Sequence, residues 1–186
     1  MRHLTFVTSN DNKVWEAEHA LGVKLRRATI ELDEIQELDL SRIIEHKAKQ
    51  AYSHLKRPVM VEDAGLYVKE WGGFPGPFIK WVQETIGYKK LPKLLPKRNR
   101  LAEWVVAYGL YDGKKFRAFE GKVRGTIAER PRGRDGWGFD PLFIPNGRRQ
   151  TYAEMGPAEK MKISARQKAL GKLRKFLRGS TERKHR

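Results

Sequence analysis

Short apolar runs alternate with amphipathic segments through the first third of the chain, and this alternation limits the fold more than any other feature. Residues 3–8 form an apolar run typical of a buried strand, and residues 13–21 have a helical pattern that Gly22 would end. A second strand near residues 24–30 and a helix over residues 41–54 follow in the same order. Strands that alternate with helices predict an α/β protein.

The middle of the chain departs from this alternation. Residues 58–61 predict a third strand, and residues 66–71 predict another. Residues 102–111 and 115–124 flank Asp112-Gly113, a dipeptide that favours a two-residue type I′ turn, so they predict a long antiparallel hairpin. A hairpin joined to alternating strands and helices predicts a mixed sheet.

The chain has the length of one compact domain, or of two lobes around a cleft, with one active site. We expect a single domain over residues 1–178 and a frayed basic tail over residues 179–186. The last helix is expected over residues 158–177, with Gly179 as its stop.

Cysteine is absent, which excludes disulfides, thiolate zinc sites and a cysteine nucleophile. No apolar run approaches the roughly 20 residues that a membrane helix needs, and the N-terminus has no signal-sequence pattern. We therefore expect a soluble, cytoplasmic protein without membrane contact.

The net charge of +17 comes from 39 Lys and Arg against 22 Asp and Glu, which is typical of nucleic-acid binding. Residues 160–186 alone hold eleven basic residues and one acidic one, so the excess belongs largely to one helix and its tail. That segment is either a solvated basic helix or a polyanion-binding surface. We expect nucleic-acid binding to be only weak or non-specific.

Two groups of carboxylates stand out in this basic chain. Residues 31–39 hold five acids and no basic residue, which fits either a solvated loop or a site for a cation. Glu62 and Asp63 follow the apolar run at residues 58–61, at the strand end where α/β sheets commonly bind ligands. Adjacent carboxylates there can hold Mg²⁺ and leave coordination positions for water and substrate phosphates.

Two further segments have side chains suited to a nucleotide. Residues 8–13, Thr-Ser-Asn-Asp-Asn-Lys, combine hydroxyls, an amide, a helix start and an ammonium group, which suits phosphate or simply a capped helix. Residues 137–140, Trp-Gly-Phe-Asp, join two aromatic rings to a carboxylate in a glycine-rich loop. These rings are either a platform for a base or part of the core.

Seven motifs occur in order between residues 4 and 170 and together carry a family resemblance. They are Thr8-Ser9-Asn10-x-x-Lys13, Glu34-Ile35-Gln36-Glu37, Val61-Glu62-Asp63, Gly73-Phe74-Pro75-Gly76-Pro77-Phe78-Ile79-Lys80-Trp81, Trp137-Gly138-Phe139-Asp140-Pro141, Thr151-Tyr152-Ala153-Glu154-Met155 and Glu159-Lys160-x-x-x-Ser164-x-Arg166. In this combination the chain resembles the inosine triphosphate pyrophosphatase family.

The resemblance implies an elongated, two-lobed α/β fold with a central mixed sheet and a cleft between the lobes, and it implies a homodimer. Enzymes of the family use Mg²⁺ to hydrolyse deaminated purine nucleoside triphosphates (ITP, dITP and XTP), which sanitises the nucleotide pool. Water attacks between the α- and β-phosphates, and the products are the monophosphate and pyrophosphate. No covalent enzyme intermediate is needed, in agreement with the absence of cysteine.

Carried over position by position, the resemblance implies four sets of site residues. The Mg²⁺ ligands would be Glu34 and Asp63. The catalytic residues would be Asp63, which orients or deprotonates the water, together with Glu62 and Lys13, and Glu37 would support them. The phosphates would be held by Thr8, Asn10, Lys13, Lys47 and Lys160. The base would contact Trp137, Phe139 and Asp140, with Arg166 facing its keto edge.

Two positions depart from the family pattern. Ser164-Ala165-Arg166 stands where the family usually has Ser-His-Arg, so a base-reading histidine is missing, and Ala64 replaces a Ser or Thr. The first change leaves open a nucleoside triphosphate pyrophosphatase of broader specificity. A nucleic-acid-binding protein is a more remote alternative. A surface that binds nucleic acid would not need Glu34 and Asp63, so dependence on a divalent metal separates an enzyme from a nucleic-acid-binding protein.

Overall fold

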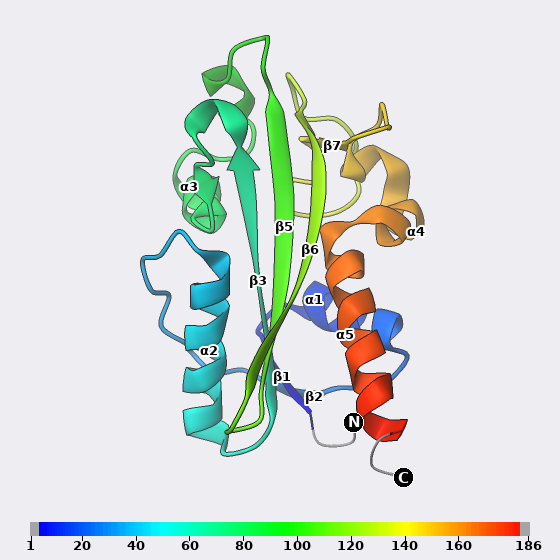
Figure 1. The fold of residues 1–186 in the computed structure, drawn as a ribbon. Helices are drawn as coiled ribbons and strands as arrows, with labels where there is room; N and C mark the ends of the chain where they lie inside the picture. Colours follow the sequence, from blue (N-terminus) through cyan, green and yellow to red (C-terminus); the bar gives the residue numbers. More distant parts are fainter. Residues whose placement is uncertain (1–3, 183–186) are drawn as a thin grey trace. The chain divides into compact units, whose positions relative to one another are not determined.

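The computed structural model describes residues 4–182. Within them one mixed sheet of seven strands runs in the order β2-β1-β3-β5-β6-β7, and β4 pairs with β3 (Figure 1). The strands are β1 (Thr5–Val7), β2 (Arg26–Ala28), β3 (Val59–Val68), β4 (Pro75–Gly76), β5 (Leu101–Tyr111), β6 (Phe116–Ile127) and β7 (Phe143–Pro145). Strand β1 is parallel to β2 and β3, whereas β3–β4 and β6–β7 are antiparallel. The predicted α/β fold with a central mixed sheet is confirmed.

The helices follow the local capping signals. They are α1 (Asp11–Leu21), α2 (Leu40–Leu55), α3 (Ile79–Thr85), α4 (Tyr152–Ile163) and α5 (Ala165–Glu182), with short 3₁₀ turns at η1 (Lys69–Trp71) and η2 (Leu91–Leu94). Asn10 and Asp39 cap α1 and α2 through their side chains, and Gly22 ends α1 with φ of 70°. None of the helices in residues 4–182 is long and apolar enough to span a membrane.

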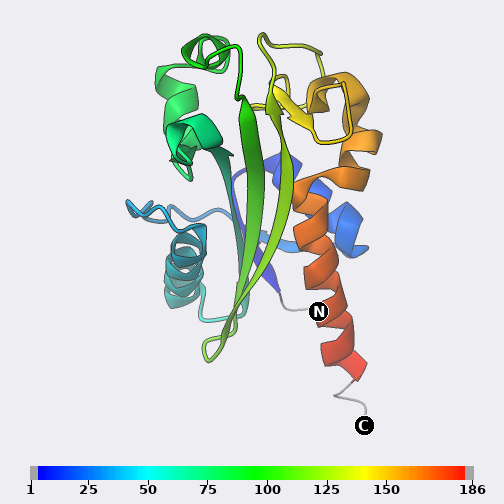
Figure 2. The same cartoon turned by 45° about the horizontal axis from the view of Figure 1, so that its top comes forward.

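The described residues divide into two compact units. Unit 1 takes the described parts of residues 1–63, 106–121 and 166–186, and unit 2 takes residues 64–105 and 122–165. In unit 1, α2 lies on one face of β3, while α1 and α5 lie together on the other (Figures 1 and 2). The unit 1 core contains Phe6, Ile44, Tyr108, Leu170 and Leu173, and the unit 2 core contains Leu66, Leu91, Phe139, Leu142 and Phe143.

Strand β3 corrects one prediction directly. Residues 58–61 and 66–71 were expected to be separate strands, but Val59–Val68 is continuous and only residues 69–71 turn away, as η1. Glu62 and Asp63 therefore lie within the strand rather than at its end. The strand pairs with β1 at Val59 and Met60 and with β4 at Leu66 and Tyr67, and β5 is its neighbour on the other side. Tertiary pairing of this kind outweighs the low strand propensity of polar side chains.

The hairpin is confirmed, because β5 and β6 are neighbours joined by residues 112–115. The prediction of a two-residue turn is wrong. The loop has four residues, and the Asp112 carboxylate accepts the N–H groups of Lys114 and Lys115, at 2.9 and 2.8 Å. This side-chain turn stabilises a longer loop than the Asp-Gly dipeptide predicts.

The last helix also differs from the prediction. Ser164 is extended, with ψ of 155°, so α4 ends before it and α5 begins after it. Gly179 does not end α5, which continues to Glu182. A glycine commonly ends a helix by adopting a positive φ, and Gly179 is not among the glycines with a positive φ. A glycine inside a helix destabilises it by only about 1 kcal/mol relative to alanine, so the helix can continue through Gly179. Residues 183–186 of the expected tail lie outside the described residues.

Candidate active site

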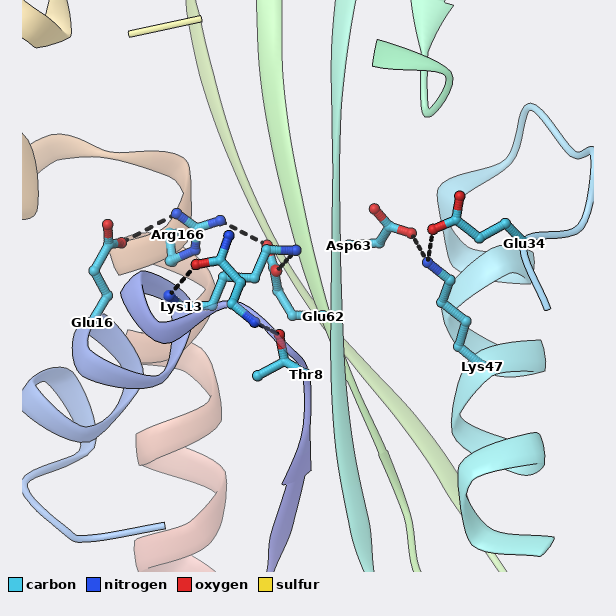
Figure 3. A network of polar contacts seen from close by, with 9 residues as sticks. Thr8, Lys13, Glu16, Glu34, Lys47, Glu62, Asp63 and Arg166 are labelled. Carbon is cyan, nitrogen blue, oxygen red and sulfur yellow. Dashed lines mark hydrogen bonds and ion pairs between the residues drawn. The ribbon is translucent and has the colours of Figure 1, made fainter. Parts of the chain in front are cut away.

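Glu62 and Asp63 point to opposite faces of β3 (Figure 3). Successive side chains of a strand alternate in this way, so the two carboxylates do not form one ion site, contrary to the interpretation from their adjacency. Glu62 contacts Lys13 and Arg166, whereas Asp63 contacts Lys47. We call Lys13, Glu16, Glu62 and Arg166 the α1 cluster, and Glu34, Lys47 and Asp63 the α2 cluster. Both belong to unit 1.

The α1 cluster is a buried chain of ion pairs. Glu62 Oε2 lies 2.5 Å from Lys13 Nζ, and Glu62 Oε1 accepts from Arg166 Nη2 at 2.9 Å. Arg166 Nη1 donates to Glu16 Oε2 at 3.2 Å. The Glu62 side chain is 0% exposed and that of Arg166 is 5% exposed. Two carboxylates and two cations give this cluster no formal net charge.

The cluster stays ionised because its charges support one another. Burial raises the pKa of Glu62, but Lys13 and Arg166 outweigh burial and lower the pKa to about 2. Burial lowers the pKa of Arg166, yet Glu62 and the other acidic groups around it raise it above its ordinary value. Tyr108 is buried near these groups, and burial raises its pKa well above the ordinary value, so its phenol remains neutral.

The loop between β1 and α1 brings three predicted phosphate ligands into one turn. The Asn10 side chain accepts the Lys13 N–H at 3.2 Å, and the Asn10 N–H donates to Thr8 Oγ1 at 3.2 Å. Because that oxygen is used as an acceptor, the Thr8 hydroxyl hydrogen can donate to a ligand. Thr8, Asn10 and Lys13 therefore gather at the start of a helix, the part of a helix that attracts anions.

The α2 cluster places one ammonium group between two carboxylates. Lys47 Nζ lies 2.6 Å from Asp63 Oδ2 and 3.6 Å from Glu34 Oε1. Burial lowers the pKa of Lys47, but Asp63 and Glu34 outweigh burial and raise it above its ordinary value. The side chains of Asp63 and Glu34 are 22% and 41% exposed, so solvent reaches both. The three groups sum to one negative charge.

The oxygen donors of the α2 cluster fit Mg²⁺. Two carboxylates already converge on one positive charge, and Mg²⁺ is usually held by one or two carboxylates with water and phosphate completing its shell. Among residues 4–182 no group of three or more His, Cys, Asp or Glu side chains forms a metal cage. Glu37 instead accepts from the Leu38 and Asp39 N–H groups and pairs with Arg42.

The predicted base-binding loop lies in unit 2 with Lys160. Asp140 Oδ2 accepts the Trp137 N–H at 2.8 Å and the Lys160 ammonium at 2.7 Å. Lys160 Nζ lies 5.4 Å from the centre of the Trp137 ring, within cation–π range. Phe139 is 2% exposed and packs against Trp104, so its ring is part of the core of unit 2.

Three residues near these groups were missed from the sequence. Glu16 lies three residues after Lys13 on α1, a helical spacing that could have placed it on the same face. No sequence pattern indicated that Tyr108 lies near the charged groups, because an aromatic residue in an apolar strand is usually part of the core. Arg27, on β2, contacts Thr8, Ser9 and Asp11, and nothing in the local sequence indicates this.

The comparisons with known proteins identify the family of the chain. The model of the Ham1 family matches residues 4–176. A protein of Methanopyrus kandleri named dITP/XTP pyrophosphatase is 42% identical over 170 residues, which cover 89% of this chain and 90% of that one. A protein of the same name from Hyperthermus butylicus is 42% identical and covers 95% of both chains.

Solved structures have the same fold. A HAM1 protein from Coxiella burnetii superposes with a TM-score of 0.85 at 24% identity, covering 95% of this chain and 98% of that one. The Mycobacterium abscessus protein described as a nucleoside-triphosphatase or dITP/XTP pyrophosphatase superposes with a TM-score of 0.72 at 26% identity, covering 91% and 97%.

Proposed function

Because the chain belongs to the Ham1 family, we propose that it uses Mg²⁺ to hydrolyse dITP, ITP and XTP to the monophosphate and pyrophosphate. Relatives about 40% identical over most of their length carry the name dITP/XTP pyrophosphatase. The observation that carries the proposal is the convergence of Glu34 and Asp63, from separate segments, on one positive charge. A nucleic-acid-binding surface has no use for such a pair.

Glu34 and Asp63 would hold the metal ion in place of the Lys47 ammonium. When bound, the ion supplies positive charge that offsets the charge of the triphosphate. Asp63, the less exposed of the two carboxylates, would orient the attacking water and accept its proton. Lys47 would remain close enough to contribute a positive charge to phosphate.

The start of α1 would hold phosphate through the Thr8 hydroxyl, the Asn10 amide and the Lys13 ammonium. Lys13 is 20% exposed although it pairs with Glu62, so its remaining N–H groups can reach a ligand. Glu62 would therefore act by fixing Lys13, and Arg166 and Glu16 fix Glu62 in turn. That Lys160 also binds phosphate stays a prediction from the family motifs.

The base would stack on Trp137, the half-buried ring of its loop, whereas Phe139 is buried against Trp104. Asp140 uses one oxygen for Trp137 and Lys160, and its other oxygen could accept from a ring N–H of a keto purine. That Arg166 reads the keto edge stays a prediction from the family motifs; its two Nη atoms already contact Glu16 and Glu62. Ala165, where a base-reading histidine is usual, supports broader purine specificity as the second candidate.

We also propose a homodimer and a cytoplasmic location, where the nucleotide pool lies. Exposed aromatic side chains at Trp15, Phe74 and Trp81 offer apolar surface for a partner copy.

A panel of nucleoside triphosphates with and without Mg²⁺ tests the proposed reaction, with pyrophosphate and orthophosphate measured separately. The expected result is Mg²⁺-dependent release of pyrophosphate, fastest with dITP, ITP and XTP. Orthophosphate as the only inorganic product, or equal rates without a divalent metal, would overturn the proposal.

A further inference from the structure

Arg27, on β2, contacts the loop between β1 and α1 through its guanidinium group. Its Nε donates to the Thr8 carbonyl at 3.1 Å, and its Nη2 donates to the Ser9 carbonyl at 2.7 Å. Its Nη1 pairs with the Asp11 carboxylate. One planar guanidinium therefore fixes two backbone carbonyls and one side chain of the loop in a geometry that no other side chain can reproduce.

We call these contacts of Arg27 with Thr8, Ser9 and Asp11 the Arg27 clamp. The clamp sets the direction in which the backbone N–H groups of the loop point. In a planar trans peptide the carbonyl and the following N–H point in opposite directions, so carbonyls held toward Arg27 turn the Ser9 and Asn10 N–H groups away from it. The Asn10 N–H then meets Thr8 Oγ1. Within residues 4–182 the backbone N–H groups of Ser9, Asp11 and Asn12 have no acceptor, as is usual at the start of a helix, and they can donate to an anion.

We propose that Arg27 is a positioning residue for the triphosphate, acting through the loop that carries Thr8, Asn10 and Lys13. The inference rests on the proposed function for its substrate, but its geometry lies wholly within unit 1. Arg27 does not need to touch the nucleotide, because all three of its guanidinium nitrogens already contact the loop.

Arg26 provides a matched control. It lies on the same strand and carries the same charge, and strand alternation directs its side chain to the other face. Arg27→Lys keeps the charge of Arg27 but removes the planar fork. The pair of variants therefore separates the geometry of the clamp from simple electrostatic attraction of the triphosphate.

Steady-state kinetics of the full chain with XTP and Mg²⁺ test the proposal. Arg27→Ala and Arg27→Lys should each raise KM about 5- to 30-fold, with a smaller fall in kcat, because charge-assisted hydrogen bonds that order the loop are lost. Arg26→Ala should stay within about 2-fold of the wild type. A wild-type KM in Arg27→Lys would show that charge alone matters and would overturn the proposal.

A double-mutant cycle tests the route of the effect. If Arg27 acts through the loop, Arg27→Ala should raise KM less in an Asn10→Ala background than in the wild type, because both changes disturb one unit. Fully multiplicative effects would contradict the proposal. A change in melting temperature without a change in KM, measured well below unfolding, would reduce Arg27 to a stabilising residue and overturn it as well.

Calorimetric binding of inorganic pyrophosphate separates this inference from the proposed function. Arg27→Ala should bind pyrophosphate about 10-fold more weakly than the wild type and Arg26→Ala equally well, whether or not any nucleotide is hydrolysed. If no deaminated purine is a substrate but this difference is seen, the function fails and the clamp stands. If XTP is hydrolysed but Arg27→Ala has wild-type KM and pyrophosphate affinity, the clamp fails and the function stands.

Discussion

The two faces of β3 carry charged clusters that begin with neighbouring residues and differ in balance and exposure. The α1 cluster pairs two acids with two cations, and its central Glu62 is fully buried. The α2 cluster has two acids for one cation, and solvent reaches both acids. A balanced buried cluster is suited to fixing side chains, whereas a solvent-exposed cluster of two carboxylates around one ammonium group is suited to exchanging one cation for another.

The difference assigns separate tasks to residues that look equivalent in sequence. The Glu62 side chain has no contact with solvent and holds Lys13 at the start of α1, the proposed phosphate site, whereas the Asp63 side chain is 22% exposed. Changes to Glu62 should therefore act mainly on stability, and changes to Asp63 mainly on turnover.

The largest expected effect is on turnover in Asp63→Asn. The substitution removes a charge but little volume, so kcat should fall about 100- to 10,000-fold, the usual contribution of a general base, while the melting temperature changes little. Glu45→Gln is the matched control, because Glu45 is also a partly exposed acid that pairs with a lysine, here on α2. Near-normal turnover in Asp63→Asn would remove Asp63 from the chemistry.

The next effect is on stability in Glu62→Gln. It leaves Arg166 and Lys13 short of a buried counter-charge, so the free energy of unfolding should fall by about 3 to 5 kcal/mol. Asp63→Asn should cost less than about 1 kcal/mol, because its site is open to solvent. Chemical denaturation of both variants measures the difference, and equal losses would break the comparison between the two faces.

Low pH should reduce the difference in unfolding free energy between the wild type and Glu62→Gln. The folded pKa of Glu62, about 2, lies below its ordinary value of 4.5, so its contribution to stability is complete above pH 4.5 and is lost as the pH falls toward 2. The gap in unfolding free energy between the wild type and Glu62→Gln should therefore narrow over this range. A gap that is constant from pH 5 to 2.5 would contradict the assigned pKa.

The smallest expected effect is on base selectivity at position 165. Ala165→His should raise the preference for ITP over ATP in kcat/KM by roughly 2- to 150-fold if the imidazole donates to the keto oxygen. Ala165 is 0% exposed, so the ring must displace its neighbours, and the variant should also be less stable. An unchanged ITP-to-ATP ratio in a folded variant would mean that other groups supply the selectivity.

Local signals in the sequence predicted the parts of the site that are local in the chain. The capping pattern of residues 8–13 was enough to bring Thr8, Asn10 and Lys13 together, and the family motifs pointed to Glu34 with Asp63. The opposite orientation of Glu62 was missed because β3 was predicted to end before it. The pairing of Arg166 with Glu16 and Glu62 was missed because it joins residues 150 and 104 positions apart, a separation on which helical and strand periodicity carry no information.

The most direct test of the division between the two faces is calorimetric titration of Mg²⁺ in the presence of a non-hydrolysable triphosphate. The wild type, Asp63→Asn and Glu62→Gln should be compared at a temperature where all three are folded. The account predicts that Asp63→Asn weakens Mg²⁺ binding at least about 10-fold, because half of the carboxylate pair is lost, and that Glu62→Gln binds Mg²⁺ like the wild type. Weakened binding in Glu62→Gln together with wild-type binding in Asp63→Asn would contradict it.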